Sequence, residues 1–156
     1  MSGYEHGRER TDDLVLDCDV VVVGSGAGGA VVACHLAEAG RDVVILEEGG
    51  HVLPHEFARM RPTQTMRHTW REAGLTMAVG VGDSPMINVM MGRCVGGSSA
   101  MTGGVCFRIP EAVLADWRAL GLTEFTPEAM EPYHADVEKS VHVEDVPERM
   151  RSRSTV

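Results

Sequence analysis

The chain has 156 residues, of which 44% are hydrophobic and 24% are charged, a composition typical of one globular domain of average size. It carries 14 Lys and Arg residues against 23 Asp and Glu residues. The resulting formal net charge of −9 disfavours nucleic acid and anionic lipid as partners. Collagen, coiled coil and disordered tail are excluded by the composition. Its 18 glycines exceed the usual share and gather in two clusters, which are the features to explain.

Cysteine usage and apolar patterning point to a reducing, aqueous compartment. The cysteines lack the spacing of a CxxC pair or of a zinc site, so we interpret them as reduced thiols; they are Cys18, Cys34, Cys94 and Cys106. The first residues do not have the pattern of a signal peptide, and apolar runs such as Val20–Val23 are far too short to cross a bilayer. We therefore expect a cytoplasmic protein without a transmembrane segment.

The first elements in chain order make one βαβ unit. Residues 1–17 are polar and are expected to form a flexible leader. The β-branched run Val20–Val23 predicts a strand that is buried on both faces, as in a parallel sheet. Residues 30–39 have helical spacing and are followed by Gly40, which suits the position just after a helix. Val43–Leu46 predicts a second buried strand, parallel to the first.

The middle of the chain has a weaker pattern. Between Gly50 and Met91, prolines and glycines predict loops with one short helix near residues 65–72. Residues 92–99 form the second glycine cluster, and residues 105–108 suit a short strand.

Two helices are expected toward the end of the chain. Pro110 suits the first turn of one helix, and Gly121 can end it. Its packed face is expected to consist of Val113, Trp117 and Leu120. The start signal at residues 126–128 predicts a second helix, which Pro132 should break or restart.

The first glycine cluster fits the GxGxxG pattern of a dinucleotide-binding turn. Gly24 permits the tight turn after the strand, Gly26 lets a pyrophosphate approach the backbone, and Gly29 allows close packing of helix against strand. The positive end of the helix dipole would face the phosphates. The remaining members of the loop, Ser25, Ala27 and Gly28, join the expected cofactor-binding set. A glycine-rich turn without a ligand is the alternative.

An acidic residue follows the second strand. Glu47 stands where a carboxylate can accept hydrogen bonds from the ribose hydroxyls of an adenosine, and it would disfavour a 2′-phosphate. Glu48 is the competing acid, which we interpret as a solvated loop charge. His51 and His55 could form a metal site on a helix, but Pro54 argues against a helix there and loop histidines explain them better.

Two motifs together resemble a known family. The run Gly-Arg-Cys-Val-Gly-Gly-Ser-Ser at residues 92–99 follows Asp-Val-Val-Val-Val-Gly-Ser-Gly-Ala-Gly-Gly at 19–29 and Leu-Glu-Glu-Gly-Gly at 46–50. This combination resembles the N-terminal signature of the glucose–methanol–choline (GMC) family of flavin oxidoreductases. With the weaker stretches at 107–110 and 132–133, the resemblance covers residues 17–147.

The resemblance implies an α/β chain with a Rossmann-like βαβ fold that binds FAD. The chain would be incomplete, an N-terminal fragment of a larger two-domain flavoenzyme. Residues 18–147 would be the N-terminal portion of the FAD-binding domain and residues 148–156 a frayed or truncated end. The first motif and Glu47 would hold the ADP half of FAD. The expected flavin-side residues are Gly92, Arg93, Gly96, Gly97, Ser98 and Thr102, the last standing where relatives commonly have Asn.

The activity implied is alcohol oxidation, in which a base takes the hydroxyl proton and hydride passes from the CH–OH carbon to flavin N5. Non-covalent FAD is expected, because the second motif contains no histidine that could link to the flavin. No catalytic residue is assigned in this chain. The acid–base residues would lie in a missing C-terminal part, so the isolated chain would be inactive. The alcohol and the electron acceptor stay open.

Two alternatives to this function remain. The chain could be a non-catalytic dinucleotide-binding remnant. It could also belong to an NAD-dependent dehydrogenase, which shares only the first motif.

Overall fold

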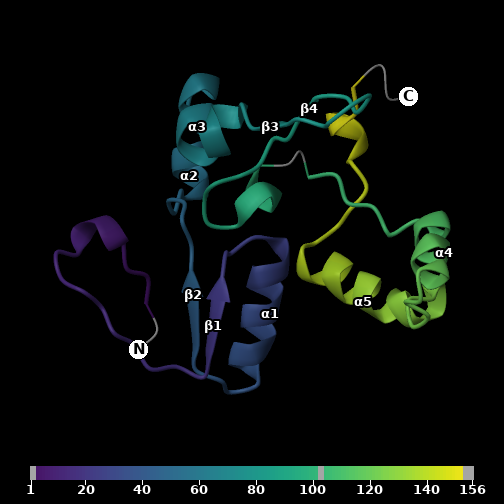
Figure 1. Cartoon of the computed structure of the whole chain (residues 1–156), viewed down its shortest axis with the longest axis horizontal. Helices are drawn as coiled ribbons and strands as arrows, with labels where there is room; N and C mark the ends of the chain where they lie inside the picture. Colours follow the sequence, from purple (N-terminus) through teal and green to yellow (C-terminus); the bar gives the residue numbers. More distant parts are fainter. Residues whose placement is uncertain (1–2, 102–103, 153–156) are drawn as a thin grey trace. The chain divides into compact units, whose positions relative to one another are not determined.

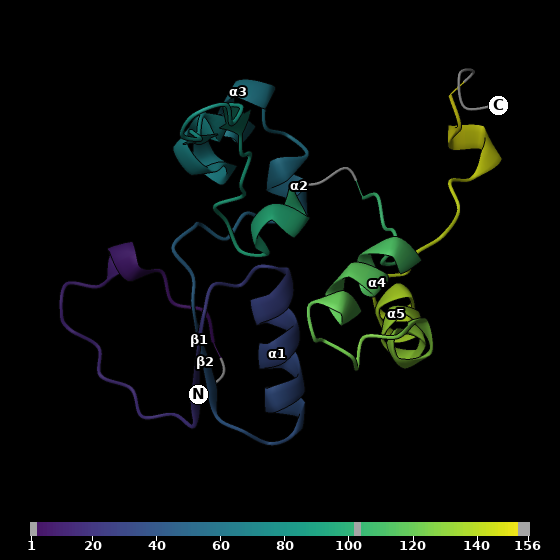
Figure 2. The ribbon, with the colours of Figure 1, turned by 45° about the vertical axis from the view of Figure 1, so that its right-hand side comes forward.

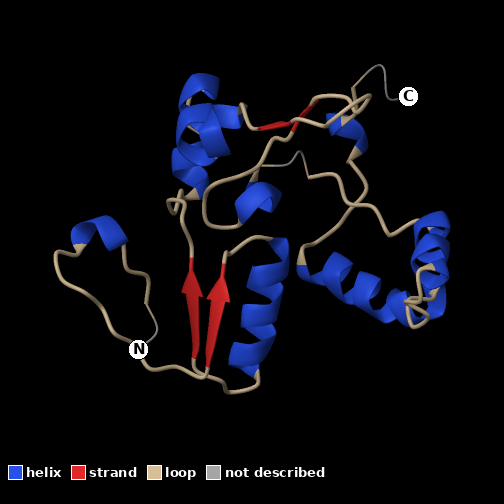
Figure 3. Ribbon diagram, in the orientation of Figure 1, coloured by secondary structure: helices blue, strands red, loops and turns tan. Residues whose placement is uncertain are grey.

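The structure of the chain is a computed structural model that describes residues 3–101 and 104–152 (Figure 1). The chain divides into two compact units, Met1–Gly104 and Val105–Val156. Both helices and strands are present, in line with the expected α/β class (Figure 3). Within the described residues, no helix combines the length and apolar character needed to cross a membrane.

The first unit contains the expected βαβ arrangement. Strand β1 (Val20–Val23) pairs in parallel with β2 (Val43–Leu46), so that Val20 lies opposite Val43 and Val23 opposite Leu46. Helix α1 (Ala27–Glu38) connects them and lies along one face of the pair (Figure 2). It begins earlier than predicted and takes in part of the glycine cluster. Gly40 has φ +81° and follows the helix, as its sequence position predicts.

Burial of both faces of these strands is not observed. The side chains of Val21 and Val23 are 54% and 83% exposed, and Leu46 is 55% exposed. The physical reason is that the described sheet has only two strands, so α1 covers one face and the other has no layer upon it. The predicted strands are confirmed, but their predicted burial is wrong for this chain.

The segment after β2 is richer in structure than expected. It contains helices α2 (Pro54–Phe57) and α3 (Pro62–Thr69) and a short antiparallel pair, β3 (Met77–Ala78) with β4 (Ile87–Asn88). The predicted helix near residues 65–72 therefore exists but starts and ends earlier. Both helices begin with proline in the first turn, where its missing N–H is not needed. Pro54 thus starts a helix, and the inference that it prevents one is wrong.

The second unit contains the two helices predicted from its proline signals, α4 (Glu111–Ala119) and α5 (Pro127–Ser140). Thr126 caps α5, because its hydroxyl accepts a hydrogen bond from the N–H of Ala129 at 3.2 Å. Gly121 has φ +97° and follows α4, as expected. The ring of Trp117 packs edge-on against Phe125, with centroids 5.4 Å apart.

Three expectations for this unit are wrong. Residues 105–108 form no strand, since no described strand lies beside them to pair with. Pro132 lies inside α5 without interrupting it, and Arg108 bonds Glu131 at 2.6 Å and Glu138 at 2.7 Å, one residue on each side of the proline. On α4 the fully buried side chain is Leu114, whereas Leu120 is 81% exposed because it stands at the helix end.

The packing of α1 on β1 gives a first testable prediction. A methyl group on Gly29 would overlap the carbonyl oxygen of Gly24, whereas one on Gly28 would meet open space. We expect Gly29→Ala to lower the free energy of unfolding by about 1–3 kcal/mol. Gly28→Ala, the matched control, should be neutral or stabilise by up to about 1 kcal/mol, because alanine favours a helix. Urea unfolding measures both, and equal effects would contradict the predicted contact.

Candidate functional site

Three loops meet at the carboxyl ends of β1 and β2. They are the glycine turn after β1, the residues that follow β2, and the second glycine cluster. The last two are joined by a bridge between Gly50 and Cys94, where the N–H of Val95 donates to the carbonyl of Gly50 at 3.1 Å. A side chain on Gly49 would overlap the backbone of Arg93. The Leu-Glu-Glu-Gly-Gly run thus ends in glycine because another backbone lies against it.

A hydrogen-bond network of Ser25, Glu47 and Gly96 connects the three loops. Oε2 of Glu47 accepts from the backbone N–H of Ser25 at 2.9 Å and from its hydroxyl at 2.7 Å. Oε1 of Glu47 accepts from the N–H of Gly49 at 2.8 Å. The hydroxyl oxygen of Ser25 accepts from the N–H of Gly96 at 3.1 Å. We call this arrangement the Ser25–Glu47–Gly96 network.

The motif glycines allow close backbone contacts. Gly24 has φ +90°, and its N–H donates to the carbonyl of Leu46 at 2.7 Å, which closes the tight turn after β1. A Cβ on Gly97, which has φ +58°, would lie 2.9 Å from the Cα of Gly26. The two glycine clusters, far apart in the sequence, are therefore in contact through atoms that carry no side chains.

The start of α1 can receive an anionic group. Helix geometry leaves the first N–H groups of a helix without intrahelical partners, and no side chain caps α1. A Cβ on Gly26 or Gly28 would meet no heavy atom within 4 Å, so the space beside the turn is open. Free donors, the dipole and open space together fit the phosphates of a dinucleotide.

The surroundings of Glu47 favour its charged form. Partial burial acts to raise the pKa of Glu47, but the hydrogen bonds from Ser25 and Gly49, with the positive charge of Arg71, outweigh it. The pKa of Glu47 is therefore lowered from its ordinary value. Glu47 is a carboxylate at neutral pH and accepts three hydrogen bonds, which leaves about one of its four acceptor positions for a ligand.

Cys94 lies beside the network but is not a reactive thiol. Its side chain is buried, and Sγ lies 3.8 Å from the carbonyl oxygen of Gly97. Burial, together with the negative charge of Glu47, raises the pKa of Cys94. The neutral thiol fills space between the loops, in keeping with its interpretation as a small buried side chain.

A cavity of about 790 Å³ opens at the network. Its walls include Ser25, Glu47, Ile45 and Val95, together with residues 3–8 near the start of the chain. Residues 7–9 of that segment form a 3₁₀ turn, for which Nδ1 of His6 accepts from the N–H of Arg8 at 3.2 Å.

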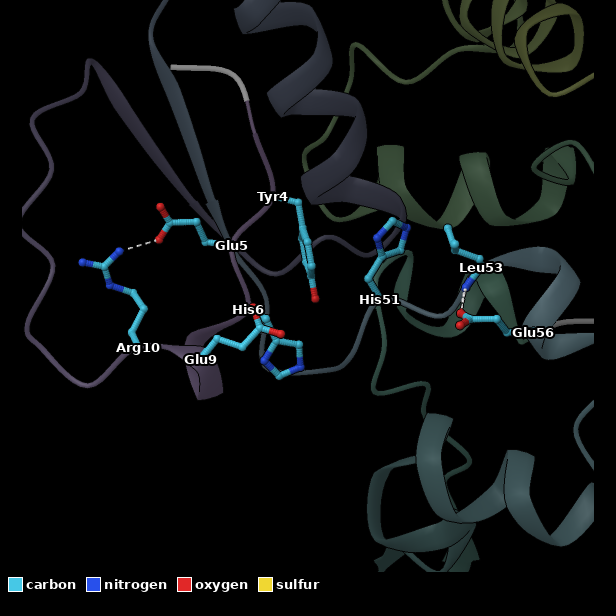
Figure 4. Close-up of a pocket in the computed structure, with 8 residues that line it drawn as sticks. All are labelled: Tyr4, Glu5, His6, Glu9, Arg10, His51, Leu53 and Glu56. Carbon is cyan, nitrogen blue, oxygen red and sulfur yellow. Dashed lines mark hydrogen bonds and ion pairs between the residues drawn. The ribbon is translucent and has the colours of Figure 1, made fainter.

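A second pocket, of about 450 Å³, lies between the same segment and the start of α2 (Figure 4). The ring of Tyr4 packs edge-on against His51 there, with centroids 5.2 Å apart. Glu56 accepts from the N–H of Leu53 at 2.9 Å, which caps α2. Among the described residues no group of His, Cys, Asp and Glu side chains is placed to hold a metal ion.

The remaining candidate residues lie around this centre. Ala27 and Gly28 are in the first turn of α1. The hydroxyl of Ser98 accepts from the N–H of Gly92 at 3.0 Å, which stabilises the second cluster internally. The side chain of Arg93 leaves the network and lies 3.7 Å from a carboxylate oxygen of Glu48. Thr102 lies outside the described residues.

Two participants were missed by sequence reasoning. Gly49 donates to Glu47, and the glycine pair after the acid is a signal that could have indicated it. Arg71 forms an ion pair with Glu48 and contributes positive charge near Glu47. No local pattern identifies Arg71, because its contacts depend on the path of the chain between α3 and β3.

The comparison with known families is decisive at this point. A family model described as GMC oxidoreductase matches residues 18–156. The chain belongs to the GMC oxidoreductase family. The resemblance inferred from the two glycine clusters is thereby confirmed, and the chain corresponds to the family's N-terminal, FAD-binding part.

Individual relatives agree with this assignment. An uncharacterised GMC-type oxidoreductase of Mycobacterium tuberculosis (strain ATCC 25618 / H37Rv) is 41% identical over 143 residues, which is 90% of this chain and 22% of the relative. A long-chain-alcohol oxidase of Arabidopsis thaliana is 38% identical over 68% of this chain and 14% of its own length. An oxygen-dependent choline dehydrogenase of Photobacterium profundum is 28% identical over 81% of this chain and 23% of its own length. The chain therefore spans less than a quarter of these relatives.

The lowered pKa of Glu47 gives a prediction about pH. A carboxylate whose pKa is lowered by folding stabilises the folded state above its unfolded pKa of about 4.3, and this contribution is lost as pH falls through the lower folded value. We expect Glu47→Gln to unfold at lower urea concentration than the wild type at pH 7. The difference should shrink as the pH is lowered toward about 3. A difference that stays constant from neutral to acid pH would contradict the role of the charge.

Proposed function

We propose that this chain is the FAD-binding N-terminal portion of a GMC oxidoreductase that oxidises the CH–OH group of an alcohol. The observation that carries the proposal is the direct contact between the two glycine clusters, through the Ser25–Glu47–Gly96 network and the approach of Gly97 to Gly26. A dinucleotide turn alone would suit NAD equally well. The second cluster beside it favours the extended FAD of the GMC family.

The ADP half of the cofactor would be held at the first cluster, in a Rossmann-like arrangement. The free N–H groups at the start of α1 would bind the pyrophosphate, since Gly26 leaves the backbone accessible. The free acceptor position of Glu47 would take one ribose hydroxyl. Because the carboxylate is charged and partly buried, a 2′-phosphate in this place would be repelled.

The flavin half would be held by the second cluster. Gly96 and Gly97 have φ values of +91° and +58°, a backbone shape that glycine adopts without strain and that leaves N–H groups uncovered by side chains. The described second-cluster stretch has no histidine, so FAD would be bound without a covalent link. When bound, FAD supplies the acceptor for the hydride that leaves the alcohol carbon.

The substrate would be a small-molecule alcohol that this chain does not itself bind. Relatives named as a long-chain-alcohol oxidase and a choline dehydrogenase support an alcohol as substrate class, and the relatives are more than four times longer than the region they share with this chain. We place the base that takes the hydroxyl proton outside these 156 residues. On this proposal, the 156 residues alone do not oxidise alcohols.

The proposal is tested with the full-length protein. Purified protein should show the absorption spectrum of bound flavin. Under anaerobic conditions, at least one member of a panel of aliphatic, sterol, polyol and choline-like alcohols should bleach it. A protein that binds no flavin, or whose flavin is reduced by NADH but by no alcohol, would contradict the proposal.

The glycine assignments give a matched pair of variants. Gly26 is extended and its Cβ direction is open, so Gly26→Val should fold normally but place its side chain where the pyrophosphate would lie. We expect FAD affinity to fall at least a hundredfold while the urea midpoint of the cofactor-free protein is unchanged. Gly28→Ala occupies an x position of the motif and should change FAD affinity less than threefold. Equal loss in both variants would show that the motif is misaligned.

A further inference from the structure

The side chain of Ser25 is placed in a way that the GxGxxG pattern does not require, since its position in the pattern is an x. The residue is buried, with 6% of its surface exposed. Its hydroxyl has one proton and it donates this proton to Glu47 at 2.7 Å. Its oxygen accepts from the N–H of Gly96 at 3.1 Å. Both capacities of the hydroxyl are therefore used, on two segments far from each other in the sequence.

We propose that Ser25 is a positioning residue whose hydroxyl couples the ADP side of the cofactor site to the flavin side. On one side it orients Glu47, the residue assigned to the adenosine ribose. On the other side it holds the N–H of Gly96, and with it the turn that brings Gly97 to Gly26. This inference rests on the proposed binding of FAD.

The two sides depend on the hydroxyl to different degrees. Without it, Glu47 still accepts hydrogen bonds from the backbone N–H groups of Ser25 and Gly49, at 2.9 and 2.8 Å. The N–H of Gly96, in contrast, loses the acceptor that the hydroxyl supplies. The adjoining turn would then be held to the first cluster mainly by the contact of Gly97 with Gly26. Loss of the hydroxyl should therefore loosen the flavin side more than the ADP side.

Alternative explanations for a buried serine make different demands. A serine that only fills space would be replaced equally well by alanine or cysteine. A serine that only stabilises the fold would weaken every ligand of the site in the same proportion. Coupling of the two sides predicts a loss that is selective for the ligand spanning both. FAD spans both sides, whereas ADP reaches only the first.

The experiment measures FAD and ADP affinities of the full-length apoprotein for four variants. Ser25→Ala removes the hydroxyl. Ser25→Cys keeps the approximate shape but replaces it by a weak hydrogen-bonding group, and so serves if the alanine variant does not fold. Ser25→Thr keeps the hydroxyl and should restore binding. Ser140→Ala, at an exposed position in α5, is the matched control.

We expect Ser25→Ala and Ser25→Cys to lose FAD affinity at least tenfold while ADP affinity changes less than threefold. Ser25→Thr and Ser140→Ala should stay within threefold of the wild type for both ligands. Equal losses for FAD and ADP, or an unchanged FAD affinity in both Ser25→Ala and Ser25→Cys, would overturn the coupling. Wild-type protein that binds neither ligand would instead refute the proposed function.

Discussion

The carboxylate of Glu47 is the interaction on which the arrangement of this site depends. It is partly buried and charged, so it must be satisfied by donors, and it receives three from two loops. Hydrogen bonds to a charged group contribute more than neutral ones, about 1.5–3 kcal/mol each. Because the donors are two backbone N–H groups and one hydroxyl, the carboxylate fixes the path of the chain as well as its side chains. The third loop is attached through the same hydroxyl, at the N–H of Gly96.

Glycine provides the complementary constraint, since the loops can reach the carboxylate only where backbones touch. A side chain on Gly49 would overlap Arg93, and one on Gly92 would overlap Gly97. These glycines are thus required for contact between segments, in contrast to Gly24, which is required for its positive φ. The high glycine content noted in the sequence has these two separate physical causes. Both lead to the same result, a site made largely of accessible backbone.

Sequence reasoning succeeded where the signal is local and failed where it depends on distant partners. Strands β1 and β2 were predicted because β-branched runs next to glycine turns are sufficient to specify them. Pro54 and Pro132 misled because the effect of proline depends on context: Pro54 lies in the first turn of α2, while Pro132 lies within a helix whose side chains Arg108 joins across it. The exposed face of β1 could not be foreseen, because burial depends on which neighbours are present. The residue types of the site were predictable, but not the link from Ser25 to Gly96.

The neighbouring acids Glu47 and Glu48 show how similar residues acquire different tasks. Glu48 is half exposed and pairs with Arg71, with Arg93 at a longer distance of 3.7 Å. Exposed ion pairs contribute at most about 1 kcal/mol, because water screens the charges and long side chains lose freedom. Glu48 therefore reinforces the meeting of the loops from outside but cannot determine it. The strand alternation that turns Glu48 toward solvent turns Glu47 toward the buried hydroxyl of Ser25, so one position in the sequence separates a surface charge from the centre of the site.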